Sequence, residues 1–337
     1  MKNLKNKKIL ITGAYGFLGS NLVKRLLDIG SEVITCDNLS RRGAELNFED
    51  LKKEYGNLNN IQAEISDIPT YIMKFKPDLI YHFAAQVAVT TSIISPVSDF
   101  RVNAEGTFGV ARAAKEFNIP VIYSSTNKAY GDNVNQVSIL EMKTRYDFKG
   151  ALRRKGINEE FSIDAAHHTP YGCSKLAGEL YVREYGGLVN RFSCMYGEWQ
   201  HGIVDQGWLS YFIMQKLKNK PVTIFGNGKQ VRDMLYVSDV IDLLLLEGSK
   251  FISSPVSMRS EVFTVGGGYN NTISLLELCS KLKIKPKFSD WRPADQKVFY
   301  CDTTKAKKVL GWAPKVSVDD GLSKLYKWTE KNIQRLG

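Results

Sequence analysis

A glycine-rich turn near the N-terminus constrains the fold of this chain more than any other feature of its sequence. The segment Thr12–Gly19, TGAYGFLG, joins a short β-branched run, Lys8–Thr12, to an apolar helical pattern, Leu18–Ile29. Its glycines permit a tight turn, a close backbone approach to a pyrophosphate, and close packing of helix on strand. The helix N-terminus offers free N–H groups and partial positive charge to the phosphates. The turn therefore predicts a dinucleotide site, with contacts from Gly13, Tyr15, Gly16, Phe17, Leu18 and Gly19.

An acidic residue at the end of the next predicted strand supports the same interpretation. Asp37 stands 18 residues after Gly19, close to the offset that a dinucleotide fold needs. A carboxylate there accepts hydrogen bonds from the adenosine ribose and repels a 2′-phosphate, which favours NAD over NADP. Arg41 and Arg42 stand nearby and can pair such a phosphate, so NADP stays open. We therefore count Asp37 and the adjacent Asn38 as candidate cofactor contacts. The structural alternative is that these two residues form an ordinary turn.

Strand-like and helical segments alternate through the first half of the chain, which predicts a parallel sheet covered by helices on both faces. Beyond residue 193 the elements become shorter and the loops richer in aromatic residues. We therefore expect an α/β fold, with a Rossmann-type doubly wound parallel sheet over residues 1–193 and a smaller, partly interwoven C-terminal α/β substrate domain over 194–337. A helix near 235–249 is expected to return to the first domain. The predicted strands are Lys8–Thr12, Val33–Cys36, Asn60–Ile65, Leu79–Phe83, Val121–Ser124 and Leu188–Phe192, and the predicted helices are Leu18–Ile29, Pro69–Phe75, Ala104–Phe117 and Ser174–Tyr185.

The carboxyl ends of the third and fourth predicted strands carry further cofactor candidates, because ligands bind at that edge of a parallel sheet. The pair Asp67-Ile68 can contact the adenine, although Asp67 serves almost as well as the N-cap of a helix that begins at Pro69. The segment Ala84-Ala85-Gln86 follows the fourth strand, and its small residues let the cofactor backbone approach. His82 precedes this segment and is interpreted as a packed histidine.

A tyrosine and a lysine four residues apart, Tyr171 and Lys175, stand at the start of a predicted helix, where their side chains share a face. A phenol with a pKa near 10 is a poor base at pH 7. A neighbouring ammonium and a cationic nicotinamide would lower that pKa. Thr126, at the end of a strand, can hydrogen-bond the reacting oxygen. Together the three residues predict proton transfer coupled to hydride transfer, whereas a surface helix pair and a strand-end cap are the structural alternatives.

Composition bears on the partners and the compartment. Forty-six Lys and Arg against 35 Asp and Glu give a net charge of +11, which suggests an anionic partner: nucleic acid, a membrane surface or a phosphorylated small molecule. The lysines are scattered, which favours a solvated basic surface for most of that excess. The five cysteines are odd in number and lack a C-x-x-C, which indicates free thiols in a reducing cytoplasm. We expect no metal cluster, membrane span or signal peptide.

These motifs occur in the order typical of the extended short-chain dehydrogenase/reductase family, the nucleotide-sugar epimerases and dehydratases, which this chain resembles over roughly residues 8–330. The resemblance rests on TGAYGFLG at Thr12–Gly19, HFAAQ at His82–Gln86, Asn103 with Gly106-Thr107, SSTNKAYG at Ser124–Gly131, the Tyr171/Lys175 pair, SCMYG at Ser193–Gly197, DQGW at Asp205–Trp208, GNGKQVRD at Gly226–Asp233, and Arg292-Pro293 with Asp295.

The resemblance implies an NAD-dependent epimerase that oxidises C2 of a CDP-hexose to a keto sugar and reduces it again from the other face. It implies lipopolysaccharide O-antigen biosynthesis as the setting, and neither a nucleic-acid nor a membrane partner. It also implies a homodimer or homotetramer in which the helices Ala104–Phe117 and Ser174–Tyr185 pair with a second copy, whereas packing within one subunit is the alternative. In the family, C-terminal arginines grip the nucleotide diphosphate, which suits a planar guanidinium. The further site residues implied are Asn103 and Ser124 for the cofactor, and Gln86, Thr126, Ser193, Gln206, Arg232 and Arg292 for the substrate.

Two departures from the family pattern bear on the reaction. Family dehydratases place Asp-Glu after the catalytic Thr, whereas this chain has Asn127-Lys128 and so lacks the acid and base of an elimination. Cys194 stands where many 4-epimerases carry an asparagine, which weakens a 4-epimerase interpretation only modestly. A UDP-sugar 4-epimerase is the alternative enzyme. A catalytically inactive dinucleotide sensor or an RNA-associated relative is the alternative of another class, which the +11 charge favours and the Tyr171/Lys175 pair opposes.

Overall fold

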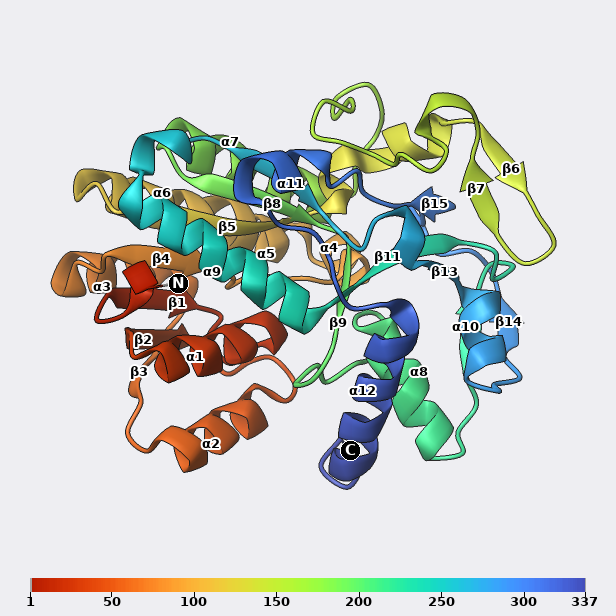
Figure 1. Cartoon of the computed structure of the whole chain (residues 1–337), viewed down its shortest axis with the longest axis horizontal. Helices are drawn as coiled ribbons and strands as arrows, with labels where there is room; N and C mark the ends of the chain where they lie inside the picture. Colours follow the sequence, from red (N-terminus) through yellow and green to blue (C-terminus); the bar gives the residue numbers. More distant parts are fainter. Residues whose placement is uncertain (1, 337) are drawn as a thin grey trace. The chain divides into compact units, whose positions relative to one another are not determined.

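A computed structural model describes residues 2–336 and divides the chain into two compact units that interleave in sequence (Figure 1). The first unit comprises the residues up to Thr126, Pro170–Arg191 and Val240–Val262, and the second comprises the intervening segments and the C-terminal part. These bounds differ from the expected 1–193 and 194–337, because residues 127–169 belong to the second unit. Tyr130, Phe148 and Ile157 of that segment share a buried cluster with Val298 and Phe299, which explains the assignment.

The first unit is built on a seven-stranded sheet whose order is β12-β8-β5-β4-β1-β2-β3. The pairs β1–β2, β2–β3, β1–β4 and β4–β5 are parallel. The strand order reverses beside β1, which is the switch point where α/β sheets bind ligands. This arrangement confirms the predicted doubly wound α/β fold. The strands are β1 (Lys8–Thr12), β2 (Glu32–Asp37), β3 (Asn59–Gln62), β4 (Leu79–His82), β5 (Val121–Thr126), β8 (Leu188–Phe192) and β12 (Val262–Val265). The last residue of β8 and all of β12 after Val262 are assigned to the second unit.

Helices cover both faces of this sheet, since neighbouring residues of a strand point to opposite sides. Ile80 of β4 packs in a buried cluster with Ile72 of α3 and Val110 of α6. The next residue, Tyr81, donates a hydrogen bond to the carbonyl of Leu244 in α9, at 2.8 Å. The helices of this unit are α1 (Phe17–Ile29), α2 (Ala44–Tyr55), α3 (Ile68–Phe75), α4 (Val89–Ile94), α5 (Pro96–Phe100), the π-helical turn η3 (Arg101–Glu105), α6 (Gly106–Glu116), α7 (Pro170–Glu184) and most of α9 (Val237–Ser253).

The second unit consists of small sheets and helices. One sheet joins β11 to β13, β15 and β9, and two further pairs are β10–β14 and β6–β7. Its strands are β6 (Ile139–Glu141), β7 (Tyr146–Phe148), β9 (Cys194–Tyr196), β10 (Thr223–Phe225), β11 (Val231–Tyr236), β13 (Thr272–Ser274), β14 (Lys287–Ser289) and β15 (Val298–Phe299). Its helices are α8 (Trp208–Leu217), α10 (Leu275–Lys281), α11 (Thr304–Leu310) and α12 (Val318–Asn332).

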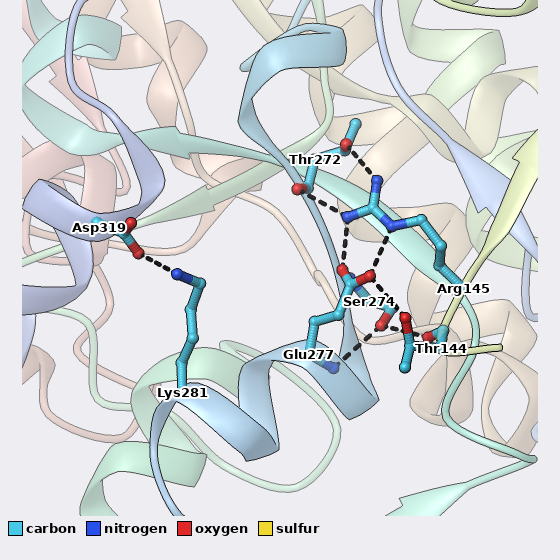
Figure 2. A network of polar contacts seen from close by, with 7 residues as sticks. All are labelled: Thr144, Arg145, Thr272, Ser274, Glu277, Lys281 and Asp319. Atoms are coloured by element: carbon cyan, nitrogen blue, oxygen red, sulfur yellow. Dashed lines mark hydrogen bonds and ion pairs between the residues drawn. The ribbon is translucent and has the colours of Figure 1, made fainter. Parts of the chain in front are cut away.

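A polar network fixes the β6–β7 hairpin, which interrupts the polar segment 131–169, to the start of α10 (Figure 2). Arg145 donates from Nε and Nη2 to the two carboxylate oxygens of Glu277, with 2.7 Å from Nε to Oε1. Glu277 also closes a capping box, since its carboxylate accepts from Ser274 N and its own N–H donates to Ser274 Oγ. Part of this polar segment is therefore held by ordered contacts.

Most predicted elements of the first unit are found within a few residues of their expected bounds. Helix α2 was missed, because its stretch carries more charged than apolar residues and shows no clear stripe. The predicted strand Asn60–Ile65 is shorter, and Ile65 begins a 3-10 turn instead. Within residues 2–336, no helix combines the length and the apolar character that crossing a membrane would require.

Candidate functional site

The turn between β1 and α1 has no space for side chains at two of its glycines. Gly13 adopts φ +66°, and a Cβ there would lie 2.7 Å from the backbone nitrogen of Ala84. A Cβ at Gly19 would lie 2.2 Å from the carbonyl oxygen of Gly13. Helix α1 follows Gly16 without a side-chain cap and without an acidic residue in its first turn. Its first N–H groups and its positive dipole end therefore fit a pyrophosphate.

Asp37 lies buried at the end of β2 and contacts this turn. Its Oδ2 accepts from the backbone N–H of Tyr15 at 2.9 Å, and its Oδ1 accepts from Leu39 N–H at 2.8 Å. Burial raises the pKa of Asp37, and the two backbone hydrogen bonds lower it. Each oxygen retains acceptor capacity for a ribose hydroxyl. The phenol of Tyr15 is buried against Thr35 at 2.7 Å, so this residue offers its backbone and not its side chain to a ligand.

The other early candidates lie at the same strand ends with different exposure. Asp67 is exposed and makes no side-chain cap on α3, so the N-cap alternative is not realised by a hydrogen bond. Ile68 is buried in the core cluster of the sheet. Asn38 donates to the carboxylate of Glu64, on the third strand's side of the site. Ala84 and Ala85 are half-buried just beyond β4, with Ala84 against Gly13.

Gln86 and Asn103 are joined to each other and to a buried aspartate. Asn103 Oδ1 accepts from Gln86 N–H at 2.9 Å, and its Nδ2 donates to the carbonyl of Gln86 at 2.9 Å. The Oδ1 of Asp99 accepts from Gln86 Nε2 at 2.7 Å and from Asn103 Nδ2 at 3.0 Å. These bonds hold the segment after β4 against α5 and η3. The side chains of both predicted residues are thus engaged within the protein.

Thr126, Tyr171 and Lys175 are buried in the first unit, at the end of β5 and in the first turns of α7. The side chains of Tyr171 and Thr126 are hydrogen-bonded. The backbone N–H of Tyr171 donates to Ser92 Oγ at 3.1 Å, which fixes the start of the helix. Burial raises the pKa of Tyr171 to about 12, while the Thr126 hydrogen bond and the Arg41 charge lower it and Asp99 raises it. In the chain alone, burial therefore outweighs the lowering expected from cationic neighbours.

Lys175 is 3% exposed and has its Nζ 4.2 Å from the ring centroid of Tyr123 in β5. Burial lowers the pKa of its ammonium to about 7, and the carboxylates of Glu179 and Asp99 act to raise it. A positive charge at this position is therefore marginal at neutral pH. The nearby His82 is a packed residue as expected, hydrogen-bonded to Thr12 and Thr107, and burial lowers its pKa to about 3. Ser124, also on β5, is half-buried.

In the second unit, Ser193 and Arg232 belong to a second polar cluster. Ser193 Oγ donates to Asp233, whose other oxygen accepts from Gly268 N–H and Cys301 N–H, each at 3.0 Å. The Nη2 of Arg232 donates to Asp295 at 2.6 Å, and this pair is only partly exposed. An arginine held by one carboxylate retains donors for an oxyanion.

Arg292 and Gln206 flank another part of that unit. The guanidinium of Arg292 stacks over Phe225, 4.0 Å from the ring centroid, and pairs with Asp205 at 3.2 Å. It also donates to the carbonyl of Val204 at 2.9 Å. Gln206 is held by a backbone bridge to Ile203 and is half-buried. Arg292 and Gln206 are thus placed by one loop, residues 203–206.

Lys128 and Cys194 interact electrostatically with Arg232. Burial and the charge of Arg232 lower the pKa of Lys128 to about 8, against the opposing effect of Asp295. Burial raises the pKa of the Cys194 thiol to about 12, so this cysteine is a neutral thiol. Asn127 donates from Nδ2 to Gln296 at 3.1 Å. The two positions after Thr126 therefore hold an amide and a cation, and not the carboxyl pair of an elimination.

Two buried carboxylates beside the Tyr171/Lys175 pair were not among the predicted site residues. Glu179 follows Lys175 by four residues on α7, so the helical period could have indicated it. Asp99 lies 76 residues before Lys175, and no sequence pattern connects the two. Its placement depends on the packing of α5 against α7. Among residues 2–336, no group of three or more His, Cys, Asp or Glu is arranged to hold a metal ion.

Comparison with known proteins relates this geometry to one family. Residues 9–255 match the model of the NAD dependent epimerase/dehydratase family. The chain is 40% identical to CDP-paratose 2-epimerase of Salmonella typhi, over 96% of this chain and 99% of that protein, and 29% identical to UDP-glucose 4-epimerase of Mycolicibacterium smegmatis, over 97% and 100%. The structure of UDP-glucuronic acid 4-epimerase from Bacillus cereus, in complex with UDP-glucuronic acid and NAD, superimposes with a TM-score of 0.79 at 26% identity, over 98% of this chain and 100% of that one.

The glycine turn and the buried acid at the end of β2 fit a dinucleotide, and the Tyr171/Lys175 pair places a phenol and an amine on one face of α7. They lie in one unit, on a sheet whose strand order is that of dinucleotide-binding α/β folds. The match to the family model covers most of that unit and part of the second. The chain therefore belongs to the NAD dependent epimerase/dehydratase family, as an enzyme whose cofactor is NAD.

Proposed function

We propose that this enzyme inverts C2 of a CDP-hexose, of the CDP-paratose to CDP-tyvelose type, by transient oxidation to a keto sugar and re-reduction. The observation that carries the proposal is the 40% identity to a CDP-paratose 2-epimerase across 99% of that protein, against 29% for a UDP-glucose 4-epimerase. Such a product would make lipopolysaccharide O-antigen biosynthesis the setting. An epimerase regenerates its cofactor in each turnover, so it consumes no external oxidant.

The first unit supplies the residues that would hold NAD. When bound, NAD would supply a hydride acceptor and donor. The glycine turn and the start of α1 bind the pyrophosphate, and Asp37 binds the adenosine ribose. The remaining cofactor contacts that we propose are Tyr15, Phe17, Leu18, Asn38, Asp67, Ile68, Ala84, Ala85, Gln86, Asn103, Ser124, Tyr171 and Lys175.

Tyr171 is the proposed acid and base. As a phenolate it accepts the proton of the sugar hydroxyl during oxidation, and as a phenol it returns a proton during reduction. Because burial raises the pKa of Tyr171 to about 12 in the chain alone, ionisation requires added positive charge at the site. Lys175 is the chain's own source of that charge, and oxidised NAD would add its cationic ring. Thr126, hydrogen-bonded to Tyr171, orients the reacting oxygen.

The proposed substrate contacts in the second unit are Ser193, Gln206, Arg232 and Arg292. Asp295 pairs with Arg232, and Asp205 pairs with Arg292. Each ion pair fixes the orientation of the guanidinium, and the N–H groups that the carboxylate does not occupy remain available to a ligand. A planar guanidinium suits bidentate binding of phosphate oxygens, and two of them suit a diphosphate. Gln86 and Thr126 of the first unit are the proposed sugar contacts.

A dehydration is disfavoured by the residues that follow Thr126. An elimination needs an acid and a base close to the reacting carbons. Asn127 does not ionise, and the pKa of Lys128, although lowered to about 8, leaves it mostly cationic at pH 7. The hydride cycle alone is therefore the chemistry that this site supports best.

Product analysis tests the ring position. The purified enzyme is incubated separately with CDP-paratose, CDP-glucose and UDP-glucose, and the products are assigned by NMR. We expect inversion at C2 of the CDP-sugar. Inversion only at C4 would reject the proposal and establish the alternative, a UDP-sugar 4-epimerase, which the 29% relative and the 4-epimerase structure keep open. The ligand retained on purification, identified by mass and by absorbance of NAD(H), tests the cofactor in the same preparation.

The alternative of another class is an inactive dinucleotide sensor or an RNA-associated relative, for which the +11 charge is the supporting observation. A protein that neutralises several phosphates binds RNA with an affinity that falls steeply with salt. Electrophoretic mobility shifts at several salt concentrations measure this dependence. Tight, salt-dependent binding without turnover of any of the three sugars would favour this alternative.

We also propose a homodimer or homotetramer in which α7 of the first unit meets a second copy together with α4 and α5. The other helix expected there, α6, is not included, because its Ala111, Ala113 and Ala114 are buried within the first unit. Exposed apolar side chains gather on α4, α5 and α7, which pack on one another. They are Ile93, Ile94, Val97, Phe100, Leu180 and Tyr181, exposed by between 44% and 84%. Exposed apolar groups on contacting helices are typical of interaction surfaces. Solution scattering tests the proposal, and a monomer would contradict it.

A further inference from the structure

Two buried carboxylates, Asp99 and Glu179, stand beside the Tyr171/Lys175 pair. Asp99 is 1% exposed and lies on α5, and Glu179 is fully buried on α7. A carboxylate is rarely buried unless it is paired or hydrogen-bonded, because desolvation penalises its charge. Both residues meet that condition, and each is bonded to a residue adjacent in sequence to a proposed catalytic residue.

Asp99 is connected to the residue before Lys175. Its Oδ2 accepts from Ser174 Oγ at 2.5 Å, and the same hydroxyl lies 3.1 Å from the carbonyl oxygen of Tyr171, which shares its hydrogen. Its Oδ1 accepts from Gln86 and Asn103, as described above. One carboxylate therefore ties the first turns of α7 to the segment after β4 and to η3. The position of the helix start, and with it the Tyr171 side chain, depends on this aspartate.

Glu179 is connected to the residue before Thr126. Ser125 Oγ donates to Glu179 Oε1. Arg191 of β8 donates from Nε to Oε1 at 3.2 Å and to Oε2 at 3.0 Å, and from Nη2 to Oε2 at 2.8 Å. Tyr171, Lys175 and Glu179 succeed one another at intervals of four residues, so they lie along one face of α7. Glu179 thereby holds the end of β5 and the middle of α7 in register.

We propose that Asp99 and Glu179 are positioning residues that hold Tyr171 and Lys175 in place and supply the negative charge that keeps the buried Lys175 cationic. The proposal deepens the proposed function and rests on it, because it assigns a role to the same proton-transfer site. It concerns this chain's own residues and involves neither a new ligand nor a new step.

The charges around the pair indicate how each carboxylate acts. Glu179 and Asp99 raise the pKa of Lys175 against its burial, and Asp99 also raises the pKa of Tyr171. Arg41 lowers the pKa of Tyr171. Loss of the Asp99 charge therefore lowers both pKa values, whereas loss of the Glu179 charge lowers only that of Lys175.

The remaining groups packed around α7 add no competing titration in the working range. His82 of β4 has its pKa lowered to about 3, and Tyr123 of β5 has its pKa raised well above 10, so both are neutral near pH 7. Ser92 of α4, Asn103 of η3 and Thr107 of α6 are uncharged. Arg101 and Glu105 of η3 are exposed, where solvent screens their charges. Arg191 is paired with Glu179.

The test is the pH dependence of three variants, followed by two readouts. Steady-state kcat/KM is measured against pH, and the Cε resonance of Lys175 in 13C-lysine protein, assigned by Lys175→Arg, is titrated separately. The limb whose displacement among the variants matches that of the Lys175 resonance is assigned to Lys175, and the other limb to Tyr171. Asp99→Asn is expected to move both limbs to lower pH, and Glu179→Gln only the Lys175 limb, each by about one pH unit. Ser174→Ala, which removes a hydrogen bond from Asp99 and keeps its charge, is the matched control.

Several outcomes overturn the proposal. If the pKa of Lys175 stays unchanged in Asp99→Asn and Glu179→Gln, the charge role is excluded. The same holds if Ser174→Ala lowers the pKa of Lys175 as much as Asp99→Asn does. Glu179→Asp restores the carboxylate and is expected to recover the Lys175 limb. If the substituted proteins do not fold, the wild-type titration decides: a buried lysine without effective counter-charge titrates near about 5 to 6, which would contradict the role. Because the resonance is read without substrate, failure of the proposed sugar chemistry leaves this test intact.

Discussion

Arg191 and Glu179 form a bidentate ion pair in the interior of the first unit, with Nη2 2.8 Å from Oε2 and side chains exposed by 3% and 1%. The pair joins β8 to α7, one helical turn after the proposed catalytic Lys175. Burying two charges costs desolvation energy that mutual attraction and hydrogen bonds offset only when the geometry is good. Here Ser125 also donates to the carboxylate, and the arginine makes three contacts to it.

Removing the cation of this pair is expected to destabilise the fold. Arg191→Leu leaves Glu179 buried without its partner, which costs about 3 to 5 kcal/mol in free energy of unfolding. Urea unfolding followed by circular dichroism measures the change. The double variant Arg191→Leu with Glu179→Leu removes both charges and should recover much of the loss. If Arg191→Leu alone were as stable as the wild type, the ion pair would contribute little to the free energy of unfolding.

Tyr171→Phe removes the phenol and keeps the ring. We expect kcat to fall by about 10²-fold to 10⁴-fold, the contribution typical of a positioned acid and base, while NAD remains bound. Turnover is measured by product NMR and NAD by absorbance after denaturation. Tyr181→Phe, on an exposed turn of the same helix, is the matched control and should keep full activity. Undiminished turnover in Tyr171→Phe would make the tyrosine structural.

Gly13→Ala tests the dinucleotide turn against a control of the same backbone conformation. Gly13 and Gly311 have φ of +66° and +69°, but a Cβ at Gly13 would meet Ala84 at 2.7 Å, whereas nothing lies within 4 Å of one at Gly311. Both variants incur the cost of a left-handed residue, about 1 kcal/mol. Only Gly13→Ala should release NAD and lower the melting temperature strongly. Equal behaviour of the two variants in NAD content and thermal melts would contradict a tight cofactor turn.

Glu247 predicts a pH dependence of stability. It is buried in α9, where desolvation raises its pKa to about 8, and Asn190 donates to its Oε2 at 2.8 Å. A raised folded-state pKa means that the acid is neutral in the fold and ionised in the unfolded chain between the ordinary carboxyl pKa and about 8. Its contribution to stability is therefore complete below about pH 4 and is lost progressively as pH rises through 8.

Glu247→Gln should remove this dependence. In the described residues, Oε1 of Glu247 and Oδ1 of Asn190 lack a hydrogen-bond donor, which a neutral side-chain amide at residue 247 can supply. We expect the variant to gain stability over the wild type at pH 8.5, on the order of a few kcal/mol, and little at pH 4. Denaturant unfolding at the two pH values measures the difference. A gain of equal size at both pH values would mean that the pKa of Glu247 is not raised in the fold.

The hairpin network of Figure 2 offers a comparison of two ion pairs that involve the same helix. Arg145 and Glu277 are three-quarters buried and bidentate, whereas Lys281 and Asp319 are exposed by 46% and 73%. Double-mutant cycles with alanine should give a coupling of about 1.5 to 3 kcal/mol for the first pair. The second should give below about 1 kcal/mol, because solvent and salt screen it. Coupling energies of the same size would show that burial does not determine the strength of these two ion pairs.

Local patterns in the sequence determined much of the first unit and little of the second. The strand β1, the turn and α1 form one continuous stretch whose glycine spacing, apolar period and flanking strand agree, so their geometry follows from neighbouring residues alone. Tyr171 and Lys175 are likewise related by the helical period. Helix α2 lacked an apolar stripe. The segment 127–169 lacked any sequence period, and its ordered structure comes from contacts with residues near 298 and 277, which no local pattern records.

The surroundings of the reactive pair were decided by tertiary structure. Asp99 reaches Ser174 across 75 positions of chain, Arg191 comes from another strand, and Arg41 comes from the loop before α2. The sequence by itself determined that a phenol and an ammonium share a helix face next to a dinucleotide turn. Which charges surround them, and how far burial shifts their proton affinities, depends on desolvation by distant segments, and a linear pattern carries no record of distances that only packing creates.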